Sequence, residues 1–109
     1  MTTWVEICKA DDLQPDSGVC ALVDGKQIAL FYSTKDQMAY AISNFDPFGQ
    51  ANVLSRGIIG DINGQLVVAS PLYKQHFNLL TGECLEDASV VVPAYQTRIV
   101  DGRVAIALE

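Results

Sequence analysis

Short apolar runs alternate with turn-forming residue pairs along most of the chain. Residues 19–23 and 26–32 flank Asp24-Gly25, residues 58–62 and 65–69 flank Asn63-Gly64, and residues 95–100 and 103–108 flank Asp101-Gly102. An Asp-Gly or Asn-Gly pair between two apolar runs favours a type I′ turn, which needs positive φ at both positions. The pattern therefore predicts three β-hairpins.

Two further runs, residues 4–9 and 38–43, have the apolar and β-branched content of strands. Residues 50–57 directly precede the second hairpin. They are too few for a stable independent helix and indicate an irregular or single-turn connection. Several short strands without a stretch of helical period are typical of an all-β fold, a small antiparallel sandwich or barrel. The 109 residues fit one domain, 1–109.

Composition and charge narrow the class of protein. Half of the residues are hydrophobic, which excludes a disordered chain, and no apolar run approaches the roughly 20 residues of a membrane helix. The first residues lack the pattern of a signal peptide, so we expect a cytoplasmic protein. The net charge of -6 and the scattered Lys and Arg residues argue against nucleic acid as a partner.

The chemistry-bearing residues are few. Cys8, Cys20 and Cys84 show no metal-binding spacing, and we expect all three to be buried thiols. His76 is the only histidine, so one chain cannot supply a pair of imidazole ligands, and we expect a structural role for it. A nucleophilic site would need His76 to lie beside Ser70 or Cys84.

Two proline-bearing loops follow apolar runs and give the strongest motif. They are Asn44-Phe45-Asp46-Pro47-Phe48-Gly49 and Ala69-Ser70-Pro71-Leu72-Tyr73-Lys74, and Thr81-Gly82 follows the second. This layout resembles the cluster-binding half of a Rieske domain, here about residues 43–82, whose loops carry Cys-Pro-His and Cys-Pro-x-His. The resemblance puts Asp46, Phe48, Ser70 and Tyr73 at the four ligand positions. These residues cannot supply two thiolates and two imidazoles, so we expect no cofactor or metal in this chain.

A narrower resemblance covers nearly the whole chain. Asp46-Pro47-Phe48, Val53-Leu54-Ser55-Arg56-Gly57, Ala69-Ser70-Pro71-Leu72 and Gly82-Glu83-Cys84 are similar to the small subunit of the NAD(P)H-dependent assimilatory nitrite reductase. The resemblance implies a non-catalytic subunit that supports nitrite reduction to ammonium in nitrate assimilation. It also implies a large partner subunit that holds FAD, an iron–sulfur cluster and sirohaem.

The two loops also suggest a docking surface. In a Rieske domain they form an exposed tip that meets electron-transfer partners, and here that tip would carry Phe48, Leu72 and Tyr73. The alternative is that these side chains fold inward and fill the space of the missing cluster. We expect Asp46, which precedes a proline, to accept N–H bonds within its own turn. A Rieske-like ferredoxin component of an oxygenase and a general β-domain adaptor remain alternative functions.

Overall fold

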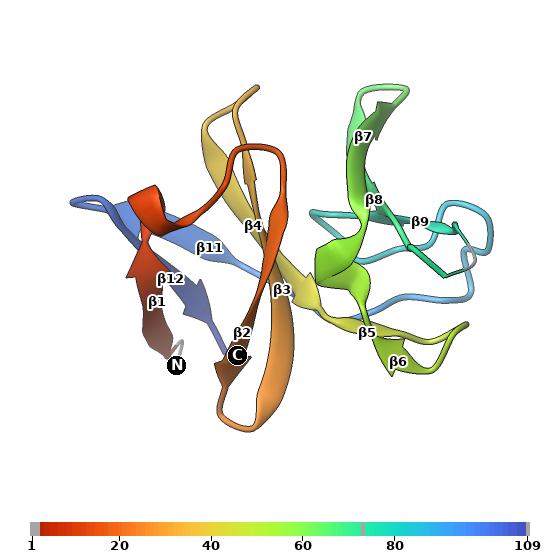
Figure 1. Ribbon diagram of the computed structural model, residues 1–109, viewed down its shortest axis with the longest axis horizontal. Helices are drawn as coiled ribbons and strands as arrows, with labels where there is room; N and C mark the ends of the chain where they lie inside the picture. The colour runs from red at the N-terminus through yellow and green to blue at the C-terminus, as the bar shows by residue number, and fades with distance from the viewer. Residues whose placement is uncertain (1–2, 73, 109) are drawn as a thin grey trace.

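The computed structural model describes residues 3–72 and 74–108, which form twelve strands and two short 3-10 helices (Figure 1). The elements are β1 (Trp4–Lys9), η1 (Ala10–Asp12), β2 (Gly18–Val23), β3 (Lys26–Ser33), β4 (Met38–Ser43), β5 (Phe45–Asp46), β6 (Ala51–Asn52), η2 (Leu54–Arg56), β7 (Ile58–Ile62), β8 (Gln65–Ala69), β9 (His76–Asn78), β10 (Ala94–Tyr95), β11 (Thr97–Val100) and β12 (Arg103–Ala107). All strand pairs are antiparallel, in sheets of order β1-β12-β11, β10-β4-β3-β2, β5-β6 and β7-β8-β9. The predicted all-β class is confirmed.

The three hairpins expected from the sequence are present. They are β2–β3, β7–β8 and β11–β12, and each is closed by the two residues that the turn motif marked. All six turn residues have positive φ: Asp24, Gly25, Asn63, Gly64, Asp101 and Gly102. The type I′ requirement of positive φ at both positions therefore explains these turns.

Strand β3 is buried on both of its faces. Ile28 and Leu30 belong to one hydrophobic core, and the alternate residues Ala29 and Phe31 belong to the other. Because side chains alternate across a strand, one β-strand can contribute to two cores. We call the first the base core; its buried residues are Leu13, Val23, Ile28, Leu30, Ala39, Ala41, Val104 and Ile106. The second, the loop-side core, consists of Ala29, Phe31, Ile42, Leu54, Val68, Phe77, Leu79, Cys84 and Val92.

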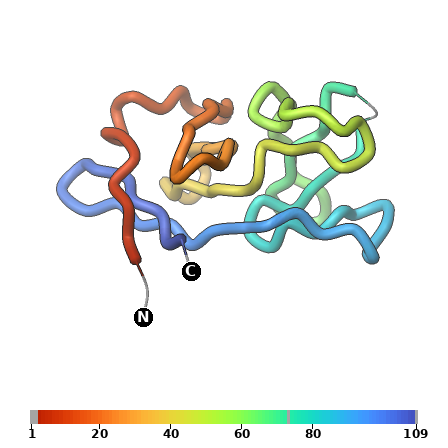
Figure 2. Tube along the Cα trace, turned by 90° about the horizontal axis from the view of Figure 1, so that it is seen from below, coloured from red at the N-terminus to blue at the C-terminus, as the bar shows by residue number. Residues whose placement is uncertain are grey.

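The two ends of the described chain lie side by side. Trp4 pairs with Ala107 in the β1–β12 ladder, and the Leu108 amide donates to the Thr3 carbonyl at 3.0 Å. Figures 1 and 2 show the start of β1 and the end of β12 close to each other. The Arg98 guanidinium stacks over the Trp4 ring at 4.2 Å from its centroid. This cation–π contact helps to hold the first strand, β1, against β11.

Some local expectations were wrong. Cys84 is buried, but Cys8 is half-buried and Cys20 is exposed, because Cys20 lies on β2, an edge strand of its sheet. The short β5–β6 pair was not predicted from the sequence either. Gln50, in the turn between these two strands, has a positive φ. Within residues 3–72 and 74–108, no helix has the length and apolar character that crossing a bilayer requires.

Candidate functional site

Asp46 lies at the centre of the first proline loop, at the end of β5. Its side chain is fully buried. The carboxylate oxygen Oδ1 accepts hydrogen bonds from the backbone amides of Phe48 at 2.9 Å and Gly49 at 3.2 Å. These bonds confirm the expected role of Asp46 within its own turn, and they hold the loop in a compact shape.

Ser70 joins the second loop to the first. It directly follows β8 and is 1% exposed, and its hydroxyl donates a hydrogen bond to Oδ2 of Asp46. The same hydroxyl oxygen accepts a hydrogen bond from the Leu72 amide at 3.3 Å. The two positions that the Rieske resemblance assigns to cysteines are therefore in contact. A carboxylate–hydroxyl hydrogen bond connects the loops there.

Phe48 folds inward. It is half-buried, and its ring lies 6.2 Å from the ring of Phe77, centroid to centroid, at an angle of 47°. Phe77 is fully buried in the loop-side core, so Phe48 extends that core toward the loops. For Phe48, the structure agrees with the inward-packing alternative that the sequence left open.

Leu72, another residue of the predicted tip, is exposed. Its side chain is 45% exposed and covers Gly49, where an added Cβ would come within 2.3 Å of Leu72 Cδ1. Gly49 thus lets the second loop lie directly against the first. Tyr73, the fourth degenerate ligand position and the third tip residue, lies outside the described residues.

The side chains at these positions do not fit a [2Fe-2S] centre. Such a centre needs two thiolates on one iron and two imidazoles on the other. Asp46 already accepts three hydrogen bonds, and Phe48 offers only an aromatic ring. Among the described residues, no group of three or more Cys, His, Asp or Glu side chains is arranged to hold a metal ion.

Asn44 is a residue that the sequence analysis did not single out. Only 2% exposed, it donates from Nδ2 to Gln27 Oε1 at 3.1 Å and accepts at Oδ1 from the Ser55 amide at 2.7 Å. Its side chain therefore ties the start of the first loop to β3 and η2. A small polar residue directly after a buried strand was the only sequence signal for this role.

His76 makes two contacts with one carboxylate. Its backbone amide and its ring Nδ1 each lie 2.7 Å from an oxygen of Glu86. Burial acts to raise the pKa of Glu86, but the hydrogen bonds from His76 outweigh it, and the pKa is lowered overall. Because the Ser70 hydroxyl donates to Asp46, the structure does not show the Ser–His pairing that a nucleophilic site needs.

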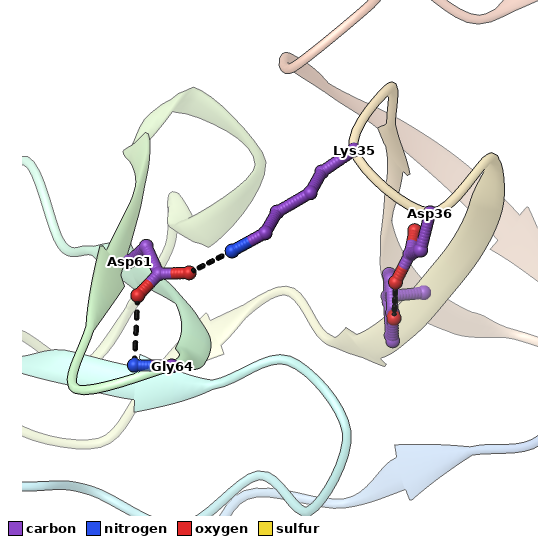
Figure 3. A network of polar contacts seen from close by, with 5 residues as sticks. Lys35, Asp36, Asp61 and Gly64 are labelled. Carbon is purple, nitrogen blue, oxygen red and sulfur yellow. Dashed lines mark hydrogen bonds and ion pairs between the residues drawn. The ribbon is translucent and has the colours of Figure 1, made fainter.

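A polar contact also joins the β3–β4 turn to strand β7. Lys35 Nζ, in the turn between β3 and β4, lies 2.8 Å from Oδ2 of Asp61 in β7, and the Gly64 amide donates to Asp61 Oδ1 (Figure 3). Both charged side chains are exposed, so we assign this pair little stability. Asp36, in the same turn, accepts a hydrogen bond from the hydroxyl of Tyr40 in β4.

We expect Tyr40 to ionise at a higher pH than an ordinary tyrosine. Burial, and then the hydrogen bond and charge of Asp36, raise the pKa of Tyr40 from 10.0 to about 12. Stability that depends on the protonated hydroxyl is complete below pH 10 and is lost as the pH rises toward 12. Spectroscopic titration of tyrosinate should show a late step that is absent in Tyr40→Phe. Ionisation of Tyr40 near pH 10 in the folded protein would contradict this expectation.

Comparison with known proteins identifies the class first. A family model described as a Rieske-like [2Fe-2S] domain matches residues 3–107. The ferredoxin of carbazole 1,9a-dioxygenase from Nocardioides aromaticivorans has a similar fold, with a TM-score of 0.83 over 98% of this chain and 99% of that chain, at 24% identity. The chain is a Rieske-like domain.

Closer relatives narrow the family. The nitrite reductase (NADH) small subunit of Salmonella typhimurium is 49% identical over 97% of this chain and 98% of that protein. The solution structure of the nitrite reductase [NAD(P)H] small subunit from Erwinia carotovora is 51% identical, with a TM-score of 0.81 over 97% of this chain and 82% of that chain. This protein belongs to the family of nitrite reductase small subunits.

In one relative, the region similar to this chain is part of a longer protein. A region of the nitrite reductase [NAD(P)H] large subunit of Klebsiella oxytoca is 40% identical to 93% of this chain, but this region is only 10% of that protein. A domain similar to this chain is therefore also found inside a much longer polypeptide.

Proposed function

We propose that this chain is the non-catalytic, cofactor-free small subunit of a cytoplasmic NAD(P)H-dependent nitrite reductase that serves nitrate assimilation. It would dock on a large subunit that holds FAD, an iron–sulfur cluster and sirohaem and reduces nitrite to ammonium. The hydrogen bond between Ser70 and Asp46 carries the proposal. It joins two of the positions that the Rieske resemblance assigns to ligands, and its carboxylate and hydroxyl transfer no electrons, which supports redox chemistry in another chain.

The relatives support the choice of partner. Two of them are named as small subunits of nitrite reductase. In the relative from Klebsiella oxytoca, the similar region lies within the large subunit's own chain. A covalent connection there keeps the domain near the rest of the large subunit, and a separate chain would need a binding surface to reach the same arrangement.

The loop tip is the first candidate for this surface. Leu72 is exposed on it, whereas Phe48 contributes mainly to packing against Phe77. Docking through Phe48, Leu72 and Tyr73 stays a prediction. Since Phe48→Ala would also open a cavity in the core, Leu72→Asp is the cleaner probe of the tip.

Affinity purification from nitrate-grown cells tests the function. We expect the tagged chain to retain a sirohaem-bearing large subunit, and Leu72→Asp to retain about tenfold less of it, because a charge replaces an apolar contact at the interface. The ratio of the two subunits in the eluate, measured by mass spectrometry and visible absorption, is the readout.

The isolated chain provides the control. Purified alone, it should be colourless, free of iron and inactive with NADH and nitrite. A brown protein with the electron-spin signal of a reduced Rieske centre would favour the oxygenase ferredoxin alternative and contradict our proposal. Retention of other proteins without any sirohaem protein would favour a general adaptor.

A further inference from the structure

A depression without charged lining residues lies between the strands around the base core and the segments around the loop-side core. It has a volume of about 270 Å³ and is formed by β4, the residues after β9, and the segment from β10 to β11. Its lining residues are Trp4, Met38, Ala39, Tyr40, Leu79, Leu80, Ala94, Tyr95, Gln96 and Thr97. We call this depression the central groove.

The composition of the central groove differs from that of the whole chain. None of its ten described lining residues is charged, although 18% of the chain is. Trp, Tyr and Met are prominent, and these residue types are enriched at the centres of protein interfaces, whereas Lys, Glu and Asp are depleted there. Leu80 is 72% exposed and Met38 is 48% exposed. The groove thus presents apolar side chains that no other part of the described chain covers fully.

Charged groups lie beside the central groove in two places. A second depression shares Tyr40 and Leu80 with the groove, and the Lys35–Asp61 ion pair is part of its lining. Arg98 lies over the ring of Trp4, another lining residue of the groove, at 4.2 Å. An apolar centre with a polar rim is the usual arrangement of a protein–protein interface.

The position of the chain ends indicates what covers the central groove. Trp4, which lines one end of it, pairs with Ala107 next to the Thr3–Leu108 hydrogen bond. In the Klebsiella oxytoca large subunit, the similar region corresponds to 93% of this chain. The rest of that polypeptide must therefore continue from near one of these two ends. Such a connection holds the large subunit at high effective concentration beside this groove.

The usual size of a protein interface is a second reason to expect the large subunit at the central groove. A stable interface uses about 20–30 residues on each partner, and the two proline loops supply only about half that number. Docking on a large subunit therefore needs a further area besides the tip, and the central groove is uncharged and carries the exposed apolar side chains that such an area requires.

We propose that the central groove, with Leu80 and Met38 at its surface, is a contact surface for the large subunit of nitrite reductase. This inference rests on the proposed function and adds the location of the interface. The occupant would place apolar side chains against Leu80, Met38 and Tyr95, and a basic or acidic group near the Lys35–Asp61 pair.

Matched substitutions at equally exposed leucines test the inference. Leu80 in the groove is 72% exposed, and Leu22 on β2, outside it, is 73% exposed. Binding of each variant to the cofactor-loaded large subunit of the same organism is measured by calorimetry. We expect Leu80→Asp to raise the Kd about tenfold or more and Leu22→Asp to change it by less than about twofold. Thermal unfolding of each variant should stay within about 3 °C of wild type, since both side chains are exposed.

Each outcome decides the question. A Leu80→Asp variant that binds like wild type, or a Leu22→Asp variant that is equally weakened, overturns the groove assignment while leaving the proposed function in place. If the wild-type chain itself does not bind the large subunit, the proposed function fails, and the groove assignment fails with it. Should Leu80→Asp unfold, Met38→Glu makes the same test from β4, with the same expected loss of affinity.

Discussion

Replacing Asp46 by alanine is expected to lower the free energy of unfolding by about 3–5 kcal/mol. Three donors lose their acceptor at once: the Ser70 hydroxyl and the backbone amides of Phe48 and Gly49. Asp46 is fully buried, so water cannot easily replace the carboxylate. Each buried donor left without a partner costs about 1–3 kcal/mol. Urea-induced unfolding, followed by tryptophan fluorescence, measures the effect.

Ser70→Ala should have a smaller effect, about 2 kcal/mol. The carboxylate keeps its two backbone donors in this variant and loses only the bond from the hydroxyl. The double variant should be less destabilised than the two single effects added together, by about 1–2 kcal/mol, because the shared bond can be lost only once. Strict additivity would show that the two loops are not coupled through this contact.

Gly82→Ala is expected to lower the free energy of unfolding by about 2–4 kcal/mol. Gly82 belongs to the Thr-Gly turn and has a φ of +80°, and an added Cβ would lie 1.9 Å from the carbonyl oxygen of Val92. The Gly82 carbonyl also accepts from the Val92 amide at 2.9 Å. The backbone would have to move apart at a contact that closes the loop-side core, at a cost of about 1–3 kcal/mol beyond the strain of the left-handed conformation.

Gly25→Ala separates the cost of backbone strain from the cost of the close contact with Val92. Gly25 has a similar φ of +77°, but no atom lies within 4 Å of its added Cβ. This variant should lose only about 1 kcal/mol, from backbone strain alone. Chemical unfolding of both variants under the same conditions gives the comparison. Equal losses at Gly82 and Gly25 would mean that the close approach of Val92 does not contribute.

Much of the fold could be predicted from local patterns. The Asp-Gly and Asn-Gly turns predicted the hairpins because their backbone requirement is local and does not depend on the rest of the chain. The short strands β5 and β10 could not be predicted, since each has only two residues. Strand β10 is defined by its pairing with β4, which is distant in the sequence, and β5 by its pairing with β6 across a loop. Exposure of Cys20 depends on β2 being an edge strand, which is a property of the assembled sheet.

The candidate site was only partly predictable. The sequence identified Asp46 and Ser70 as degenerate ligand positions through the spacing of the proline loops. It could not show that Ser70 donates to Asp46, because the two residues are brought together only when two loops from different sheets meet. The role of Asn44 was missed for the same reason, since its partners come from β3 and η2.

The sequence by itself determined the all-β class and the hairpin turns, and it shows neither Cys nor His at the four positions that the Rieske resemblance assigns to ligands. These are properties of residue type and of neighbours in the chain. Only the tertiary structure decided that Phe48 turns inward onto Phe77, that Leu72 stays exposed, and that an uncharged groove opens beside the chain ends. Such features depend on which elements pack together, and burial and surface shape arise from contacts between residues far apart in the sequence.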